Sequence, residues 1–237
     1  MNSTALTVKV FGDGADLAGI LALAENPAIK GFTTNPTLMR QAGVDDYEAF
    51  AHEVLASVTD KPISFEVFSD DFTDMARQAR KIASWADNVY VKIPVTNTLG
   101  ESSNPLVKDL SHDGVKVNVT AMFTVDQVHD TMAALEGGAP ANVSVFAGRI
   151  ADAGIDPIPT MCAALDVLAD HPQVELIWAS PREILNIVQA HEIGCHIITV
   201  THDLLKKLPN IGKDLDEFSL DTVKMFANDA ATVGYTL

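Results

Sequence analysis

The sequence predicts an α/β protein, a single (β/α)8 TIM barrel with an extra helix at its C-terminal end. Its 237 residues fall in the range where such barrels form one domain. Short apolar runs alternate with longer amphipathic runs throughout, which is typical of βα units around a parallel sheet. No Gly-rich dinucleotide fingerprint follows any apolar run, so an open doubly wound sheet is the less favoured alternative.

Eight short segments rich in β-branched and aromatic residues are the expected strands. They lie at Leu6–Phe11, Gly31–Thr34, Ile63–Phe68, Val89–Ile93, Lys116–Thr120, Asn142–Phe146, Glu175–Ala179 and His196–Val200. Because no linker, solenoid repeat or low-complexity tract interrupts this alternation, we treat residues 1–237 as one domain.

Helical periodicity predicts a helix after each of these strands, and cap residues support several of them. The expected helices are Ala15–Glu25, Tyr47–Ser57, Phe72–Ser84, Leu106–Asp113, Val125–Glu136, Ile158–Asp170, Pro181–Ala190 and Asp203–Leu208. Asp71 is suited to begin one helix and Gly114 to end another. A further helix, roughly Leu215–Ala231, forms a C-terminal appendage of about residues 213–237.

Composition excludes several classes of function. A net charge of −16 argues against nucleic acid and against anionic membrane surfaces as partners, since both require a basic footprint. An anionic substrate would therefore need a local cluster of basic residues. Cys162 and Cys195 lack CxxC spacing and suggest neither a metal site nor a disulfide framework. The start of the sequence does not resemble a signal peptide, and no stretch approaches a membrane span, so a cytoplasmic enzyme is expected.

One strand carries a lysine near its C-terminal end, in the segment DNVYVKIP that spans residues 87–94. Burial of Lys92 among β-branched neighbours would favour its uncharged amine, which is the form that attacks a carbonyl group. Taken alone, a lysine at a strand end more often reaches solvent or an ion pair. The polar residues at the other strand ends favour a catalytic role for Lys92 over this simpler interpretation.

The active sites of (β/α)8 barrels lie at the C-terminal ends of the strands, where this sequence concentrates polar side chains. Pairs such as Ser64/Glu66 and Asn118/Thr120 alternate within a strand, so both members point to the same face, here the lumen. The candidate residues at these ends are Asp13, Thr33, Asn35, Ser64, Glu66, Lys92, Asn118, Thr120, Ser144, Phe146, Arg149, Ser180 and Arg182. A carboxylate, a lysine, hydroxyls and amides converging from most strands predict a catalytic site.

Individual residues also have simpler interpretations. Asp13-Gly14 is suited to a turn or a helix cap, and Asn35-Pro36 to a turn that enters a helix. The arginines could form surface ion pairs, and Phe146 alone would be a core residue. The scattered histidines show no ligand spacing, and we assign them no chemistry.

Six segments, in order, resemble the transaldolase family. They are GFTTNPTLM, SFEVF, VYVKIPVT, VNVTAMF, NVSVFAGRI and WASPRE, and they extend from about Phe11 to Leu208. The similarity is greatest to the short-chain branch, which also contains the fructose-6-phosphate aldolases. The resemblance implies a class I, Schiff-base barrel without metal or other cofactor, whose lysine lies on the fourth strand, where Lys92 falls.

The resemblance also implies a role for each candidate residue. Lys92 would form the imine with the ketose carbonyl, and Asp13 would move the proton of the C4 hydroxyl. Glu66 and Thr120 would hold a catalytic water. The substrate-binding residues would be Thr33, Asn35, Ser64, Asn118, Ser144 and Phe146. The phosphate would be bound by Arg149, Ser180 and Arg182, in keeping with the bidentate geometry of guanidinium groups.

Two positions favour a transaldolase over an aldolase. In the aldolases of this branch, the resemblance implies a glutamine at the position of Glu66 and a tyrosine at the position of Phe146. This chain has neither residue there. A phenylalanine ring can neither donate nor accept a proton, which leaves the water to Glu66 and Thr120. The expected reaction is transfer of a dihydroxyacetone unit from sedoheptulose 7-phosphate or fructose 6-phosphate to an aldose phosphate, in the pentose phosphate pathway. A fructose-6-phosphate aldolase and a non-catalytic sugar-phosphate-binding barrel are the alternatives.

Two departures from the family pattern concern the mouth of the barrel. Pro181 stands inside the usual phosphate motif, and the segment of residues 96–105 is longer than usual, so it is expected to reshape the acceptor pocket. The resemblance further implies a homo-oligomer, such as a pentamer or decamer, in which the C-terminal helix contacts a neighbour.

Overall fold

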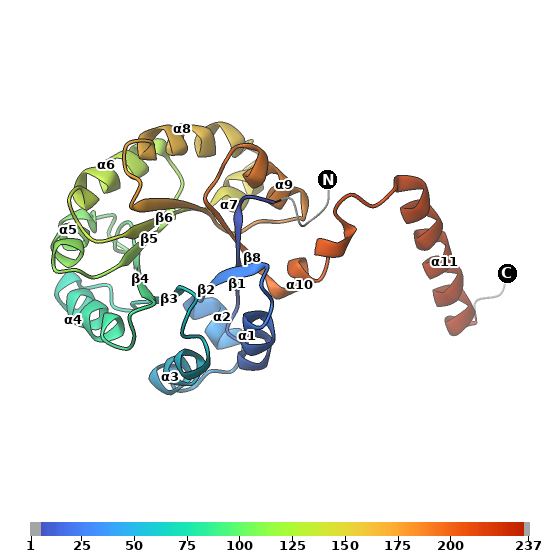
Figure 1. Cartoon of the computed structure of the whole chain (residues 1–237), viewed down its shortest axis with the longest axis horizontal. Coiled ribbons are helices and arrows are strands. Elements are labelled where there is room, and N and C mark those ends of the chain that lie inside the picture. Colours follow the sequence, from blue (N-terminus) through green and yellow to red (C-terminus); the bar gives the residue numbers. More distant parts are fainter. Residues whose placement is uncertain (1–5, 235–237) are drawn as a thin grey trace.

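The chain folds into a closed barrel of eight parallel strands surrounded by helices, which confirms the predicted fold class (Figure 1). The computed structural model describes residues 6–234. Neighbouring strands pair in the order of the sequence, and β1 closes the barrel by pairing with β8 over five residues. All eight strands therefore direct their C-terminal ends to the same mouth of the barrel.

The strands are β1 (Lys9–Asp13), β2 (Ile29–Thr33), β3 (Ile63–Glu66), β4 (Val89–Pro94), β5 (Val117–Met122), β6 (Ala141–Val145), β7 (Val174–Trp178) and β8 (Ile197–Thr201). The surrounding helices are α1 (Leu17–Ala24), α2 (Pro36–Gln41), α3 (Tyr47–Ser57), α4 (Phe72–Ala83), α5 (Asn104–His112), α6 (Val125–Leu135), α7 (Ala147–Asp152), α8 (Ile158–Leu168), α9 (Leu185–Glu192) and α10 (His202–Leu205). A short 3-10 helix, η2 (Leu208–Asn210), leads to α11 (Leu215–Val233).

The predicted caps are confirmed. Asp71 precedes α4 and accepts a hydrogen bond from the backbone N–H of Asp74 at 2.9 Å. Gly114 follows α5 with φ +88°, a left-handed conformation that favours glycine.

The main differences from the predicted elements lie at the mouth of the barrel. The first strand begins at Lys9 and continues to Asp13, because Gly12 and Asp13 pair with both β2 and β8. Two helices, α2 and α7, follow β2 and β6 directly and were not predicted. Each has only six residues, too few to show a helical period in the sequence.

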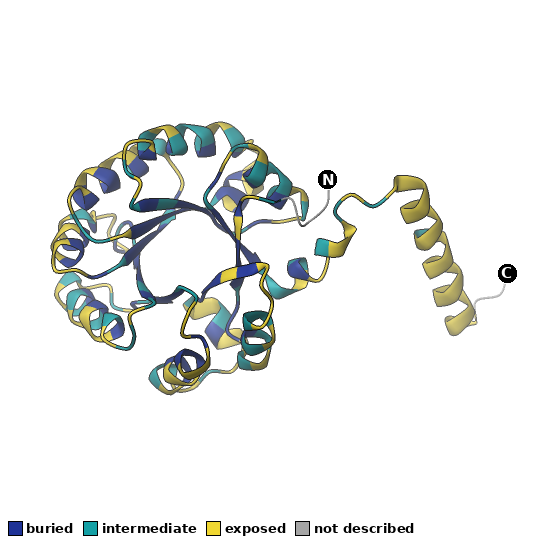
Figure 2. Ribbon diagram, in the orientation of Figure 1, coloured by how far each residue is buried: buried dark blue, intermediate teal, exposed yellow. Residues whose placement is uncertain are grey.

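The apolar core occupies two places. The larger part lies between the strands and the ring of helices, where it includes Phe32, Phe65 and Trp178, and the burial colouring shows the strands as its centre (Figure 2). A smaller cluster of Phe11, Ile177, Ala179 and Ile197 fills the lumen. Gly31 makes room for this cluster, because a Cβ at that position would collide with the Phe11 ring. Within the described part of the chain, the interior of the barrel is therefore filled by packed side chains and forms no open channel.

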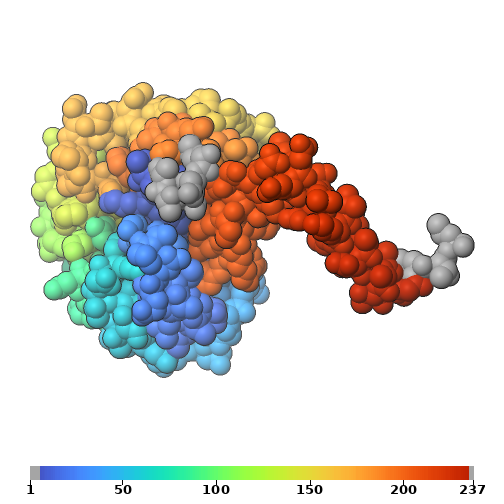
Figure 3. Space-filling model, turned by 45° about the vertical axis from the view of Figure 1, so that its right-hand side comes forward, coloured from blue at the N-terminus to red at the C-terminus, as the bar shows by residue number. Residues whose placement is uncertain are grey.

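The last helix, α11, lies apart from the barrel and makes an arm on one side of it (Figures 1 and 3). None of its residues is buried (Figure 2). The expected helix Leu215–Ala231 is thus confirmed and extends to Val233, while residues 235–237 of the predicted appendage lie outside the described residues. Within residues 6–234, no helix combines the length and the apolar composition that crossing a membrane requires.

Candidate active site

A cavity of about 550 Å³ opens at the C-terminal ends of the strands. All but two of the candidate residues from the sequence line it. These are Asp13, Thr33, Asn35, Glu66, Lys92, Thr120, Ser144, Phe146, Arg149, Ser180 and Arg182. The barrel topology, which brings eight strand ends to one mouth, accounts for this convergence of residues far apart in the sequence.

Lys92 lies at the floor of the cavity on β4 and is 6% exposed. Its Nζ lies 3.2 Å from Oε2 of Glu66 on β3 and donates a hydrogen bond of 2.9 Å to the backbone carbonyl of Thr34. The pairing of Glu66 with Lys92 in the β3–β4 ladder places the two side chains side by side on the lumen face. The amine is thus held at the floor of the cavity by one ion pair and one hydrogen bond.

Asp13 ends β1 and faces the same cavity. Its Oδ1 accepts a hydrogen bond of 2.7 Å from Oγ1 of Thr33, which is also bonded to Oγ1 of Thr199. Burial raises the pKa of the Asp13 carboxyl, although Lys92 and Thr33 oppose this shift. Asp13 is not the helix cap that its sequence context allowed, since Asp16 caps α1 by accepting from the backbone N–H of Gly19.

Ser64 and Asn118, the two candidates absent from the cavity lining, form a buried chain of hydrogen bonds with Ser144. Asn118 donates from Nδ2 to Oγ of Ser64 at 3.0 Å and accepts at Oδ1 from Oγ of Ser144 at 2.7 Å. The chain links β3, β5 and β6 across the lumen. The polar groups of these three residues are hydrogen-bonded to one another, and only Ser144, at one end of the chain of hydrogen bonds, lines the cavity.

Thr120 presents an unused hydroxyl to the cavity. Its Oγ1 is buried and has no hydrogen-bond partner within residues 6–234. The next residue, Ala121, has φ +62°, and the β5–β6 register shifts between Val119 and Met122. This β-bulge turns the strand at Thr120, and a buried hydroxyl without a partner at such a place is suited to bind a ligand or a water.

Asn35 has two functions at once. It is the N-cap of α2, where its Oδ1 accepts a hydrogen bond of 3.0 Å from the backbone N–H of Leu38, and Pro36 occupies the first turn. It also lines the cavity. With its oxygen engaged in the cap, the amide nitrogen is the group available to a substrate hydroxyl.

The predicted phosphate-binding residues gather on the opposite wall. Arg149 lies on α7, above the ring of Phe146 at 5.9 Å from its centroid, while Ser180 and Arg182 follow β7. Arg182 donates from Nη1 to Oγ of Ser180 at 2.9 Å and forms a bidentate pair with Asp152 through Nε and Nη2. This ion pair fixes the direction of the guanidinium group at the rim, and the Arg182 partner lowers the pKa of Asp152.

The backbone beside Pro181 is tightly constrained. Ser180 has φ +61°, a left-handed conformation that is uncommon for a residue with a side chain. Its carbonyl oxygen approaches α7 at Gly148, where any Cβ would overlap it. Gly148 therefore allows α7 and the turn after β7 to lie close together, with Arg149 and Arg182 on the same side of the cavity.

The long segment after β4 lies outside the lining of the cavity, and its expected effect on the acceptor pocket stays a prediction. Residues 96–102 form a small hairpin with a bridge between Thr96 and Ser102, and α5 begins at Asn104. None of residues 96–105 lines the cavity. Asn97 closes the hairpin by accepting from the backbone N–H groups of Leu99 and Glu101. Thr98 is bound to Asp70 in the loop after β3, which holds the hairpin over that side of the mouth.

Several residues that line the cavity were not predicted from the sequence. Gln41, Thr37 and Leu38 come from α2, the short helix that was not predicted, and Thr199 and Thr201 come from β8. Alternation along β8 would have placed these two threonines on the lumen face. For α2, the Asn-Pro pair was the available signal, since it indicates a helix start.

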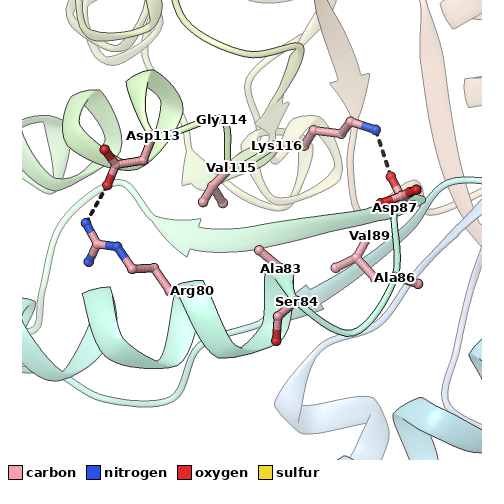
Figure 4. A pocket seen from close by; sticks show the side chains of 10 residues that line it. All are labelled: Arg80, Ala83, Ser84, Ala86, Asp87, Val89, Asp113, Gly114, Val115 and Lys116. Carbon is pink, nitrogen blue, oxygen red and sulfur yellow. Dashed lines mark hydrogen bonds and ion pairs between the residues drawn. The ribbon is translucent and has the colours of Figure 1, made fainter.

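A second hollow of about 610 Å³ lies at the other end of the barrel, near the start of β4 and β5 (Figure 4). Both of its basic side chains have partners: Arg80 pairs with Asp113 at 2.7 Å, and Lys116 donates to the backbone carbonyl of Asp87 at 2.7 Å (Figure 4). We therefore assign it no chemistry. Among residues 6–234, no three His, Cys, Asp or Glu side chains are grouped to hold a metal ion.

Comparison with known proteins agrees with this geometry. The model of the family described as transaldolase/fructose-6-phosphate aldolase matches residues 10–237. A probable transaldolase from Dehalococcoides mccartyi is 33% identical over 202 residues, covering 85% of this chain and 90% of that protein. Probable transaldolases from Streptococcus pyogenes and Streptococcus equi subsp. zooepidemicus are each 36% identical with the same coverage. The chain thus belongs to the transaldolase/fructose-6-phosphate aldolase family.

Proposed function

We propose that this protein is a class I, Schiff-base transaldolase of the pentose phosphate pathway. It transfers a dihydroxyacetone unit from sedoheptulose 7-phosphate or fructose 6-phosphate to an aldose phosphate. The observation that carries this proposal is the buried Lys92, whose Nζ lies 3.2 Å from Glu66 at the floor of a cavity that also contains Asp13. The similarity to probable transaldolases of other organisms supports the same activity.

The proposed reaction begins at Lys92. Its uncharged amine attacks the ketose C2 carbonyl, and loss of water leaves an iminium ion. Asp13 removes the proton of the C4 hydroxyl, the C3–C4 bond breaks, and the iminium accepts the electron pair to become an enamine. The aldose fragment leaves. The enamine then attacks the aldehyde carbon of the acceptor, Asp13 returns the proton, and water hydrolyses the new iminium to release the ketose and Lys92.

Glu66 and Thr120 are proposed to hold the water for imine formation and hydrolysis. Glu66 lies beside Nζ, and the Thr120 hydroxyl faces the cavity without a partner in the described part of the chain. Asn35, Thr33 and Ser144 line the cavity wall and are proposed to bind substrate hydroxyls. In this proposal, Ser64 and Asn118 act from beneath, by fixing the orientation of Ser144.

Arg149, Ser180 and Arg182 are proposed to bind the substrate phosphate at the rim. Two guanidinium groups on one wall form the local basic cluster that an anionic substrate needs on a chain of net charge −16. The proposed chemistry needs no cofactor, since the lysine imine acts as the electron sink.

The first test is turnover of fructose 6-phosphate with and without erythrose 4-phosphate, with glyceraldehyde 3-phosphate as the measured product. We expect product only when the acceptor is present. Release without acceptor would instead support the fructose-6-phosphate aldolase alternative, which shares imine formation and cleavage but protonates the enamine. Absence of product in both assays would support a non-catalytic sugar-phosphate-binding barrel.

The second test is Lys92→Ala. We expect activity to fall to background while the far-UV circular dichroism of the barrel is retained, because Lys92 supplies the only proposed nucleophile. Borohydride reduction in the presence of fructose 6-phosphate should add mass to the peptide with Lys92, and the variant should add none. Lys116→Ala, a lysine at the opposite end of the barrel, is the matched control and should keep both activity and labelling. Labelling at another lysine would contradict the assignment.

We further propose a cytoplasmic homo-oligomer, with a pentamer or decamer as the expected size. Its support is α11, a helix of 19 residues with no buried residue, whose exposed side chains include Phe218, Val223 and Phe226. An apolar helix surface of this length is a liability in a monomer and is suited to pack on a second copy.

A further inference from the structure

The ladder between β2 and β3 ends early, just below the catalytic floor. It pairs Phe32 with Ile63 and Thr33 with Ser64, and the backbone N–H of Thr34 donates to the carbonyl of Ser64 at 3.1 Å. One more step of a parallel ladder would bond the N–H of Glu66 to the carbonyl of Thr34. The carbonyl of Glu66 would then face Pro36, which has no N–H to donate.

Tyr47 occupies this place instead. It is the first residue of α3, and its hydroxyl accepts a hydrogen bond of 2.8 Å from the backbone N–H of Glu66. The same hydroxyl donates to the backbone carbonyl of Glu66 at 3.0 Å. A single phenol thus satisfies both groups that β2 leaves without partners. As a result, the carbonyl of Thr34 is free to accept from Nζ of Lys92 at 2.9 Å.

The ring of Tyr47 is held firmly enough to fix its hydroxyl. It packs edge to face against Phe68 and Phe65, with ring centroids 4.5 and 6.1 Å away, and its ring centroid lies 5.9 Å from that of Trp85. Burial also raises the pKa of the phenol, which keeps it protonated and able to donate.

We propose that Tyr47 is a positioning residue for the imine chemistry, because its hydroxyl takes the strand-edge hydrogen bonds of Glu66 and so leaves the Thr34 carbonyl to hold Lys92. The inference rests on the proposed function, which makes Lys92 the nucleophile. Tyr47 does not line the cavity and touches no substrate; it acts through Glu66 and Thr34. Without the hydroxyl, the N–H of Glu66 turns to the Thr34 carbonyl, and the amine loses its hydrogen bond to that carbonyl and keeps only the ion pair with Glu66.

The test is Tyr47→Phe, which keeps the ring and its packing but removes both hydrogen bonds. Tyr90→Phe is the matched control, since Tyr90 lies on the same barrel but lower on β4, away from the cavity. We expect Tyr47→Phe to lower kcat by roughly ten- to a hundredfold, the scale of a small misplacement of a reacting group, with KM within about twofold. Borohydride trapping at Lys92 should slow in parallel. Tyr90→Phe should change neither quantity more than about twofold.

A crystal structure of Tyr47→Phe separates this inference from the transaldolase assignment, because it needs no activity. We expect the Thr34 carbonyl to accept from the N–H of Glu66 and to lose its contact with Nζ of Lys92. An unchanged contact between Lys92 and Thr34, or an equal loss of kcat in both tyrosine variants, would overturn the role of Tyr47. Absence of turnover in the unsubstituted protein would contradict the transaldolase proposal alone, and the crystal structure would still decide the role of Tyr47.

Discussion

Asp13 is buried at the end of β1, where desolvation raises the pKa of its carboxyl above the ordinary value of 3.8. The folded protein therefore binds a proton at this site more tightly than the unfolded chain does. Stability from this group is present at low pH and is lost as pH rises from about 3.8 through the raised value in the folded state. Asp13 therefore costs stability at neutral pH relative to an uncharged side chain, although Lys92 and Thr33 oppose the shift.

We accordingly expect Asp13→Asn to be more stable than the unsubstituted protein at neutral pH, by about 1 kcal/mol, while its transfer activity falls. An amide keeps an acceptor for Thr33 but carries no charge. Urea unfolding at pH 7 and pH 3.5 measures the effect, and the gain should shrink at the lower pH. Asp203→Asn, an exposed aspartate after β8, is the control. A loss of stability at pH 7 would show that desolvation is not the dominant effect at Asp13.

Phe146 fills the position that decides, in our proposal, between transfer and cleavage. It lines the cavity between Ser144 and Arg149, and its ring lies 5.9 Å from that of Phe123. Phe146→Tyr adds a hydroxyl that can join the water held by Glu66 and Thr120, and water would then compete better for the intermediate. We expect cleavage of fructose 6-phosphate without acceptor to rise several-fold relative to transfer, measured as the ratio of the two rates. An unchanged ratio would place the determinant at another residue.

At the scale of single residues, the sequence predicted the lumen-facing side chains better than the hydrogen bonds between them. Alternation along β3 and β5 placed Ser64/Glu66 and Asn118/Thr120 on the lumen face, but it could not tell which of them would reach the cavity. Ser64 and Asn118 satisfy each other below it. Tyr47 was unpredictable for a stronger reason: its role depends on a ladder between β2 and β3 that ends early, which is a tertiary feature.

At the scale of elements, the mouth of the barrel is shaped by two short helices, α2 and α7. The long amphipathic helices and the apolar strands follow from periodicity, whereas α2 and α7 have six residues each and no measurable period. Both are nevertheless functional in our proposal, because α2 supplies one wall of the cavity and α7 carries Arg149. Sequence periodicity therefore predicts the scaffold more completely than it predicts the site.

The close contact between α7 and the turn after β7 yields a prediction of its own. Gly148→Ala introduces a Cβ where the carbonyl oxygen of Ser180 lies, so α7 and the turn must separate. We expect a loss of stability of about 1–3 kcal/mol, the usual cost of overpacking. We also expect a severalfold rise in KM for fructose 6-phosphate, because Arg149 and Arg182 move apart. Steady-state kinetics with this substrate and with fructose, a donor without the phosphate, separate the two effects. An equal change for both donors would contradict a phosphate site on this wall.

At the scale of the whole molecule, the charge of the cavity lining differs from the strongly negative net charge of the chain. The chain carries 32 acidic and 16 basic residues, yet the cavity lining holds three basic residues, Lys92, Arg149 and Arg182, and two acidic residues, Asp13 and Glu66. The acidic exterior repels polyanions, while the local basic groups attract a small sugar phosphate into the mouth. Transfer activity should therefore fall with added salt chiefly through KM, since screening weakens this attraction without altering the imine chemistry.

The exposure of the arm formed by α11 is not explained by packing within a single chain. Its helix begins at an N-cap, Asp214, and ends at Gly234 with φ +71°, so it has its own start and stop signals. None of its residues is buried, and Phe226 is 62% exposed. A helix of this kind gains little from its own hydrogen bonds and is stabilised mainly by packing of an apolar face, which a second copy can supply.

We expect the double variant Phe218→Ser/Phe226→Ser to shift the protein from an oligomer toward single chains, because it removes the two largest apolar side chains exposed on the arm. Sedimentation velocity at several protein concentrations measures the distribution of species. Ile155→Ser, which removes an exposed apolar side chain from the barrel itself, is the matched control and should leave the distribution unchanged. Since the active-site residues of our proposal all come from the barrel, the dissociated variant should retain imine formation at Lys92. An oligomer of unchanged size would show that α11 does not hold the copies together, and a monomeric unsubstituted protein would contradict the proposed assembly itself.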